Sequence, residues 1–223
     1  MLLAGGASQR LGQPKALAPL PLGTPLERLA KAAGATFPTP PLLVTGHHHA
    51  ELTAAVHAAR LDVEIVHNPR WAQGRTTSVQ AAAEHSPGCS LVLLPIDHPR
   101  IRATLLERLV STWLELGGPP RGWLAPSSRV HFGPNDELEL SESRELPLQP
   151  GHPICVGREL IALLFEDLNA WAARPLRDLR VEADPLWSFE VKHSHDALAI
   201  HENLDTPEDL ARISARDVPP TTS

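Results

Sequence analysis

Short aliphatic runs alternate with amphipathic stretches along the first half of the chain, and Gly, Pro or Asn separates one from the next. The aliphatic runs are predominantly apolar and lack the strict alternation of a half-exposed strand. We therefore interpret them as strands covered on both faces of a mostly parallel sheet. These runs span residues 2–4, 42–46, 63–67 and 91–96.

Helical patterns fill the stretches between these runs. Apolar residues recur there every three or four positions, as on the buried face of an amphipathic helix. The patterns cover residues 26–33, 52–59, 79–83 and 105–110. Strands alternating with helices predict an α/β fold.

The second half of the chain is less regular. We predict a strand at 123–126, a long flexible loop over the acidic, proline-bounded stretch 133–150, a strand at 154–156, a helix at 160–165, and late strands at 186–191 and 198–200. Neither repeats nor low-complexity segments interrupt the sequence. We therefore expect a single domain over residues 1–216.

The last predicted helix, over residues 206–213, has favourable chemistry at its start. Thr206 is suited to capping the helix, and Pro207 fits the first turn. Glu208 and Asp209 complement the positive end of the helix dipole. Beyond this helix we expect residues 217–223 to form a disordered tail.

Composition narrows the class of protein. An apolar fraction of 42% suffices for one sizeable core, and a net charge of −6 argues against a nucleic acid polymer or an anionic membrane as a general partner. Cys89 and Cys155 are too few for a disulfide scaffold, which favours a cytoplasmic location. No apolar run approaches the ~20 residues of a membrane span. A local basic pocket for a small anion remains compatible with this charge.

The opening segment, residues 3–15, reads Leu-Ala-Gly-Gly-Ala-Ser-Gln-Arg-Leu-Gly-Gln-Pro-Lys. It places Gly5 and Gly6 at the carboxyl end of the first strand, where open α/β sheets bind ligands and where backbone N–H groups can approach phosphate oxygens. Arg10 and Lys15 add positive charge. The spacing fits neither a Walker A loop nor a Gly-x-Gly-x-x-Gly motif. Taken alone, glycines with a basic residue favour an ordinary strand-to-helix turn with two solvated cations over a phosphate loop.

The same segment resembles the signature of the nucleotidyltransferases that activate molybdopterin and related phosphorylated substrates with CTP or GTP. The resemblance implies a Rossmann-like three-layer nucleotidyltransferase domain whose first loop wraps the nucleotide triphosphate. It assigns nucleotide binding to Leu3, Ala4, Gly5, Gly6, Ser8 and Lys15. Arg10 and Lys15 are the cations expected to neutralise the triphosphate during catalysis.

Asp97 follows the strand at 91–96, at the same sheet edge as the glycine loop. One carboxylate beside a triphosphate suits Mg²⁺, which completes its octahedron with phosphate oxygens and water. Taken alone, Asp97 is equally suited to capping the next helix. The family resemblance implies that Asp97 is a metal ligand. It also implies a second metal contact in the stretch His-Glu-Asn-Leu-Asp-Thr-Pro-Glu-Asp, from either Asn203 or Asp205.

Two further segments resemble the family. Residues 68–79 contain Asn-Pro-x-Trp-x-x-Gly followed by Ser at a helix start, which implies that Asn68, Gly74 and Ser78 lie against the nucleotide. Arg70 or Arg75 would add charge there. Residues 151–153, Gly-His-Pro, place His152 on the acceptor side, although the acceptor motif that should follow is present only in part at 167–174.

We therefore expect a Mg²⁺-dependent enzyme that transfers a nucleoside monophosphate from a nucleoside triphosphate to a phosphorylated small molecule such as molybdopterin. CTP is the favoured donor and GTP is an alternative. The incomplete acceptor motif keeps sugar phosphates, alcohol phosphates and phosphonates open as acceptors. A non-catalytic nucleotide-binding protein of the same fold is the alternative from another functional class.

Overall fold

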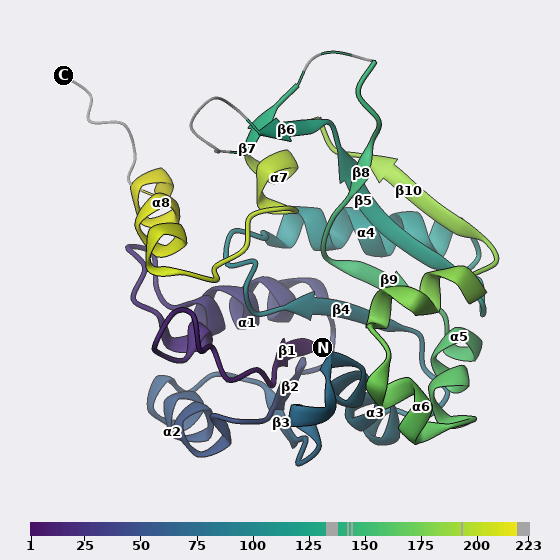
Figure 1. The fold of residues 1–223 in the computed structure, drawn as a ribbon, viewed down its shortest axis with the longest axis horizontal. Coiled ribbons are helices and arrows are strands. Elements are labelled where there is room, and N and C mark those ends of the chain that lie inside the picture. Colours follow the sequence, from purple (N-terminus) through teal and green to yellow (C-terminus); the bar gives the residue numbers. More distant parts are fainter. Residues whose placement is uncertain (133–137, 142, 144, 193, 218–223) are drawn as a thin grey trace.

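A mixed sheet with helices on both faces forms the centre of the molecule (Figure 1). The computed structural model describes the chain except residues 133–137, 142, 144, 193 and 218–223. In spatial order the sheet consists of β10 (Leu186–Glu190), β5 (Trp123–Ser128), β9 (Ile154–Val156), β4 (Leu91–Pro95), β1 (Leu2–Ala4), β2 (Leu42–Thr45) and β3 (Glu64–His67). β8 (Gln149–Pro150) pairs with β5, and β6 (Val130–Phe132) with β7 (Leu138–Leu140).

Alternate side chains of the central strands point to opposite faces of the sheet and belong to two separate hydrophobic cores. Leu2 and Leu94 pack in one core with apolar residues of α1, α2 and α4, whereas Leu3 and Leu93 point to the opposite face and pack against α3, α5 and α6. The helices are α1 (Pro25–Thr36), α2 (His49–Ala59), α3 (Arg75–His85), α4 (Ala103–Glu115), α5 (Arg158–Ala162), α6 (Leu168–Ala173), α7 (Ser194–Ala199) and α8 (Pro207–Asp217). Short 3₁₀ turns occur at η1 (Lys15–Leu17), η2 (Trp71–Gln73), η3 (Leu163–Phe165) and η4 (Leu176–Glu182). The predicted α/β fold with a mostly parallel sheet is confirmed.

Local chemistry explains where α1 begins. The Thr24 hydroxyl accepts a hydrogen bond from the Glu27 N–H, and the Glu27 carboxylate accepts one from the Thr24 N–H. This reciprocal capping box satisfies two backbone donors that the helix itself leaves unpaired. α8 begins similarly, because Thr206 accepts from the Asp209 N–H as its sequence predicts. These caps fix the loops that precede both helices.

Two strand predictions are wrong, one of them only in part. Residues 198–200 form no strand: Leu198 and Ala199 complete α7, because the buried stretch Ala197 to Ile200 packs helically against the core. β9 forms where a strand was predicted, and its direction, which the sequence left open, is antiparallel to both β4 and β5. β3 is a sheet edge whose Glu64 and His67 are exposed, so it is not covered on both faces.

The predicted boundaries also change near the loop and the tail. Within 133–150 the structure contains β7 and β8, and the rest of the predicted flexible loop lies partly outside the described residues. Asp217 is not part of a disordered tail: it ends α8, and its side chain is 4% exposed because it pairs with Arg28. Residues 218–223 lie outside the described residues.

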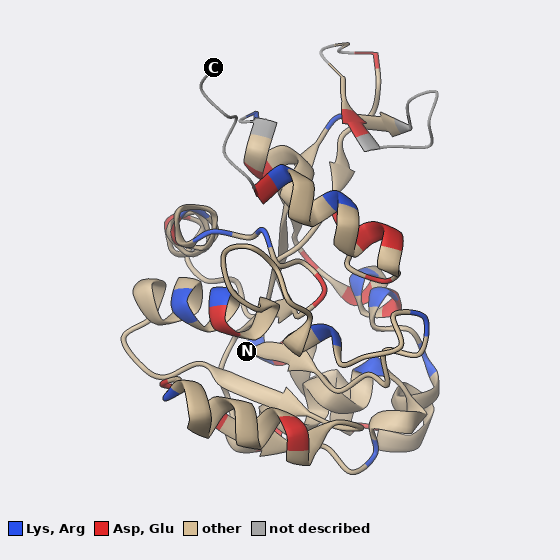
Figure 2. Ribbon diagram, turned by 90° about the vertical axis from the view of Figure 1, so that its left-hand side faces the viewer, with Lys and Arg blue, Asp and Glu red and all other residues tan. Residues whose placement is uncertain are grey.

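Charged side chains of both signs are interspersed over the side of the molecule shown in Figure 2. This distribution matches the mixed composition of the chain, with 20 basic and 26 acidic residues. In the part of the chain that the structure describes, every helix is too short or too polar to cross a membrane.

Candidate functional site

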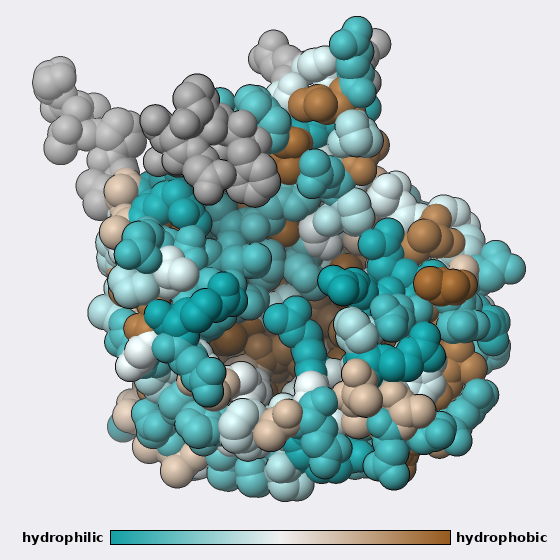
Figure 3. Space-filling model, in the orientation of Figure 1, coloured by the Kyte–Doolittle hydropathy of each residue, from teal (hydrophilic) through white to brown (hydrophobic). Residues whose placement is uncertain are grey.

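The loops after β1 and β4 meet because these neighbouring strands are parallel, with Leu2 opposite Leu94. A cavity of about 170 Å³, the loop cavity, lies where they meet. Figure 3 shows the surface hollowed in the middle of this face, with apolar residues in the hollow and hydrophilic residues around it. The predicted site residues that line the loop cavity are Leu3, Ala4, Gly5, Gly6, Ser8, Lys15, Gly74, Ser78 and Asp97.

Ser8 shapes the glycine-rich loop. Its backbone adopts φ 52°, a left-handed conformation that is uncommon outside glycine. Its carbonyl accepts hydrogen bonds from the Leu11 and Gly12 N–H groups, and its hydroxyl accepts one from the Lys15 N–H at 3.1 Å. The loop is therefore folded back on Ser8, which fixes the start of the turn that carries Lys15.

Gly5 lies where the loop approaches α3. A Cβ atom at this position would be 2.9 Å from the Ser78 hydroxyl, whereas a Cβ at Gly6 would meet nothing within 4 Å. Gly5 thus permits the close approach of the loop to the start of α3. Gly6 leaves its backbone open toward the cavity that it lines.

A second cavity, of about 290 Å³, adjoins the first, and we call it the aspartate cavity. The two cavities share Lys15, Arg75 and Asp97. The aspartate cavity adds the remaining predicted site residues apart from Asn68, namely Arg10, His152, Asn203 and Asp205. The tertiary structure therefore brings together residues from both ends of the chain.

The carboxylates that line these two cavities are paired with nearby cations. Asp205 forms ion pairs with Lys15 and with Arg10, the latter at 2.7 Å. Asp97 lies 3.8 Å from the Lys15 ammonium and 3.9 Å from the Arg75 guanidinium. Two carboxylates and three cations thus face one another without a large excess of either charge.

Asp97 carries the donor chemistry of a metal ligand. Its Oδ1 is buried without a hydrogen-bond partner, an arrangement that costs free energy unless another group supplies one. Burial by itself raises the pKa of Asp97, but His98, Arg75 and Lys15 outweigh burial and hold the pKa below its usual value. The carboxylate is therefore ionised at neutral pH.

These residues fit Mg²⁺, which needs only one or two protein carboxylates. The unpartnered Oδ1 of Asp97 is one available donor. The Asp205 carboxylate and Asn203 line the same cavity. Within the described ranges there is no cluster of three or more His, Cys, Asp or Glu residues with metal-binding geometry, so these residues are not arranged as a zinc-type site.

Asn68 lies beneath the loop cavity and does not line it. Its amide nitrogen donates to the hydroxyls of Thr77 and Ser78 at 2.8 and 3.0 Å, and its Oδ1 accepts from the Arg70 N–H. Since the residue is 1% exposed, its hydrogen-bonding groups are directed inward. The structure therefore gives Asn68 contacts that position Ser78, which itself lines the cavity.

Three histidines surround Asp97 on the acceptor side predicted from the sequence. Burial and, to a smaller extent, the neighbouring His98 lower the pKa of His152 to about 3. Burial likewise lowers the pKa of His201 to about 4 and depresses that of His98. Burial therefore favours the neutral form of all three imidazoles, which line the aspartate cavity.

The sequence left the choice between Arg70 and Arg75 open and gave no role to Gly46. Arg75 was only an alternative to Arg70, yet it lines the loop cavity and the aspartate cavity, whereas Arg70 lies 4.0 Å from Glu84. Gly46 ends the strand run at 42–46, and a Cβ there would lie 2.4 Å from the Gly5 carbonyl and 2.5 Å from the Trp71 Cβ. A glycine directly after a buried strand was the available signal for this close approach.

The chain is similar to several known proteins. Residues 1–184 match the model of the MobA-like NTP transferase domain. The molybdenum cofactor cytidylyltransferase of Escherichia coli K12 is 26% identical over 219 residues, which cover 97% of this chain and 95% of that protein.

Solved structures share the fold at lower identity. Molybdopterin-guanine dinucleotide biosynthesis protein A from Archaeoglobus fulgidus is 20% identical, with a TM-score of 0.65 over 96% of each chain. Rv0371c from Mycobacterium tuberculosis H37Rv, solved in complex with manganese, is 19% identical, with a TM-score of 0.61 over 97% of each chain. With a family model matched over most of its length, the chain belongs to the MobA-like NTP transferase domain family.

Proposed function

We propose that this nucleotidyltransferase transfers CMP from CTP to a phosphorylated small-molecule acceptor, with molybdopterin as the favoured acceptor, and that it requires Mg²⁺. One observation carries the proposal: the glycine loop with Lys15 and the unpartnered oxygen of Asp97 face a single pair of joined cavities. A triphosphate and its metal ion need such an arrangement of cations and carboxylate.

The reaction is an in-line transfer. A phosphate oxygen of the acceptor attacks the α-phosphorus of the nucleotide, the new phosphoanhydride bond forms, and the bond to pyrophosphate breaks. Because the attacking oxygen is already ionised, no side chain has to remove a proton. Gly5, Gly6 and Ser8 hold the triphosphate, and Lys15 with Arg10 neutralises its charge during transfer.

Asp97 and either Asn203 or Asp205 would hold Mg²⁺. When bound, this ion would neutralise part of the negative charge on the phosphates. The fit of Asp97 rests on its buried, unpartnered Oδ1 and its depressed pKa. The manganese complex of Rv0371c supports a divalent ion in a protein of this fold.

The choice of CTP is supported by the name of the Escherichia coli relative, which aligns over nearly the whole chain. A thermal-shift screen of CTP, GTP, UTP and ATP with Mg²⁺ tests it. A ligand at a hundred times its dissociation constant should stabilise the protein by about 2.7 kcal/mol. A selective shift with GTP would identify GTP as the donor in place of CTP. The absence of any selective shift would contradict the proposal that the protein binds a nucleoside triphosphate.

Lys15→Ala tests the catalytic site. Loss of a charged group that stabilises the transition state costs about 3 kcal/mol, so pyrophosphate release should fall roughly a hundredfold while the protein stays folded. Lys31→Ala is the matched control, because Lys31 is an exposed lysine of α1. Near wild-type turnover by folded Lys15→Ala would overturn the assignment.

The acceptor is tested separately. Pyrophosphate release is measured with molybdopterin and with a panel of sugar phosphates, alcohol phosphates and phosphonates, each with Mg²⁺ and CTP. Turnover with molybdopterin alone supports the favoured acceptor. Turnover with another member of the panel reassigns it, and tight nucleotide binding without turnover on any acceptor favours a non-catalytic binding protein.

A further inference from the structure

A third cavity, of about 310 Å³, opens beside the aspartate cavity. Arg75, Arg177, Arg180, Trp123 and His152 lie in its lining, and we call it the arginine pocket. Arg177 and Arg180 come from η4. None of the motifs that resemble the nucleotidyltransferase family includes these two residues.

The two arginines of η4 have no anionic partner within the described part of the chain. Neither side chain makes an ion pair or a hydrogen bond there, whereas Arg174, on the preceding turn, pairs with Asp178. Arg177 is exposed, whereas the Nε of Arg180 is buried and unpartnered. A buried charged donor without an acceptor is unfavourable, so this geometry favours a ligand that supplies one.

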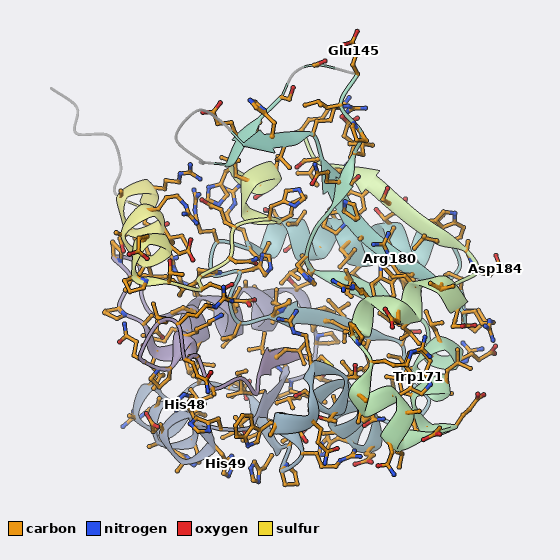
Figure 4. The ribbon with its side chains drawn as sticks, in the orientation of Figure 1. His48, His49, Glu145, Trp171, Arg180 and Asp184 are labelled. Carbon is orange, nitrogen blue, oxygen red and sulfur yellow. The ribbon has the colours of Figure 1, made fainter. Side chains whose placement is uncertain are left out.

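Figure 4 shows the contrast between Arg180 and a nearby charged residue. Arg180 lies over the strands near the middle of the view, whereas Asp184 lies at the outer edge of the molecule. Arg180 is half-buried and lines a cavity. A lone solvated arginine would extend into water.

Apart from the arginines and His152, the residues that line the arginine pocket are apolar or small. Trp123 and Ile154, both buried, form part of the wall on the sheet side, and Leu176 contributes from η4. Apolar walls with two guanidinium groups fit a ligand that has an apolar or ring-shaped body and an anionic end. A simple inorganic ion would leave these walls uncovered.

The arginine pocket is continuous with the site of transfer. It shares Arg75, Pro150, Gly151 and His152 with the aspartate cavity. His152 stands at the junction, with its ring centroid 4.8 Å from that of His98, the residue after Asp97. A molecule in the arginine pocket can therefore extend a reactive group toward Asp97.

We propose that the arginine pocket binds the body of the acceptor, and that Arg177 and Arg180 hold a second anionic group of the acceptor, distinct from the phosphate that attacks the nucleotide. This inference rests on the proposed function. It narrows the substrate class to acceptors with an apolar or ring-shaped body and two anionic groups. Arg75 lines all three cavities, so it would then contact both the nucleotide and the acceptor.

The first experiment does not depend on turnover. In ¹⁵N-arginine-labelled protein, the Nε–H resonance of Arg180 is followed during titration with inorganic phosphate. We expect a saturable shift whose dissociation constant rises at least about fivefold in Arg177→Gln, because one charge-assisted contact is lost. The resonance of Arg158, an exposed arginine outside the pocket, should not shift. No saturable shift of the Arg180 resonance would overturn the anion site, whatever the protein's activity.

The second experiment compares the two substrates. In Arg177→Gln/Arg180→Gln, the KM for the acceptor identified by the panel should rise about thirtyfold or more, because two charge-assisted contacts are lost. The KM for CTP should stay within twofold, and Arg158→Gln should change neither. An unchanged acceptor KM overturns the pocket. If the wild-type protein does not bind CTP, the proposed function is contradicted. The phosphate titration then tests by itself whether the arginine pocket binds an anion.

Discussion

At the scale of single residues, Asp205 connects two proposed roles. Its carboxylate pairs with Lys15 and Arg10, the two cations proposed for the triphosphate, and it also lines the cavity proposed for the metal ion. Its backbone N–H donates to the Asp209 carboxylate at 2.9 Å, which fixes it at the start of α8. On the proposed function, a triphosphate would therefore compete with the Asp205 carboxylate for the same two cations.

Asp205→Asn tests this competition. Without Mg²⁺, in the presence of EDTA, the affinity for CTP should rise about tenfold, because Lys15 and Arg10 no longer have an anionic partner in the protein. Mg²⁺ should also raise the CTP affinity of Asp205→Asn by a smaller factor than it raises that of the wild-type protein. Isothermal titration with and without EDTA measures both effects, and Glu208→Gln, an exposed change in the same segment, should alter neither. Weaker metal-free binding by Asp205→Asn would contradict the competition.

At the scale of the elements, the site depends on strand ends that approach one another closely. The carboxyl ends of β1 and β2 lie side by side, and the 3₁₀ turn η2 packs across them through Trp71. The His47 N–H donates to the Gly5 carbonyl at 3.1 Å, which links the β2 end to the glycine loop. Gly46 allows this approach because it has no side chain.

Gly46→Ala should therefore destabilise the fold by about 2 kcal/mol, since the added methyl group would overlap backbone atoms that cannot rotate away. CTP binding should weaken as well, because the glycine loop is displaced. Gly34→Ala is the control: nothing lies within 4 Å of a Cβ there, and alanine in a helix should stabilise α1 by about 0.5–1 kcal/mol. Urea denaturation followed by tryptophan fluorescence measures both, and equal stability of the two variants would refute the packing argument.

At the scale of the whole molecule, buried ion pairs connect the end of the described chain to its beginning. Asp217 at the end of α8 pairs with Arg28 of α1 at 2.6 Å and lies 3.7 Å from Arg100. Arg100 also pairs with Glu202 at 2.6 Å, just before the segment that carries Asn203 and Asp205. The network anchors the late segment of the site against the first half of the fold.

Asp217→Ala should lower the free energy of unfolding by about 3 kcal/mol, because two largely buried guanidinium groups lose a partner. Their side chains are only 12% and 7% exposed, so water cannot fully replace it. Asp62→Ala, at an exposed position, should change stability by less than about 0.5 kcal/mol. Denaturation curves of both variants measure the difference. A loss for Asp217→Ala no larger than for Asp62→Ala would show that the network does not stabilise the fold.

The sequence predicted the first half of the fold well. Its strands and helices alternate with clear periodicity, and glycine or proline marks most boundaries, so local patterns suffice there. The second half was harder to predict. Residues 154–156 form a strand as expected, but their apolar run has no signal for antiparallel pairing. The apolar run at 198–200 fits a buried strand and a buried short helix equally well, so its hydrophobicity could not distinguish the two.

By itself, the sequence determined the α/β class, the glycine loop with Lys15, and Asp97 at a strand end, because each depends on a short local pattern. Only the tertiary structure placed Asp205 against Lys15 and Arg10, directed Asn68 inward, and opened the pocket of Arg177 and Arg180 beside His152. These arrangements join residues more than a hundred positions apart, or depend on which face of an element is buried. Such long-range pairing follows from the packing of the whole sheet and leaves no local mark in the sequence.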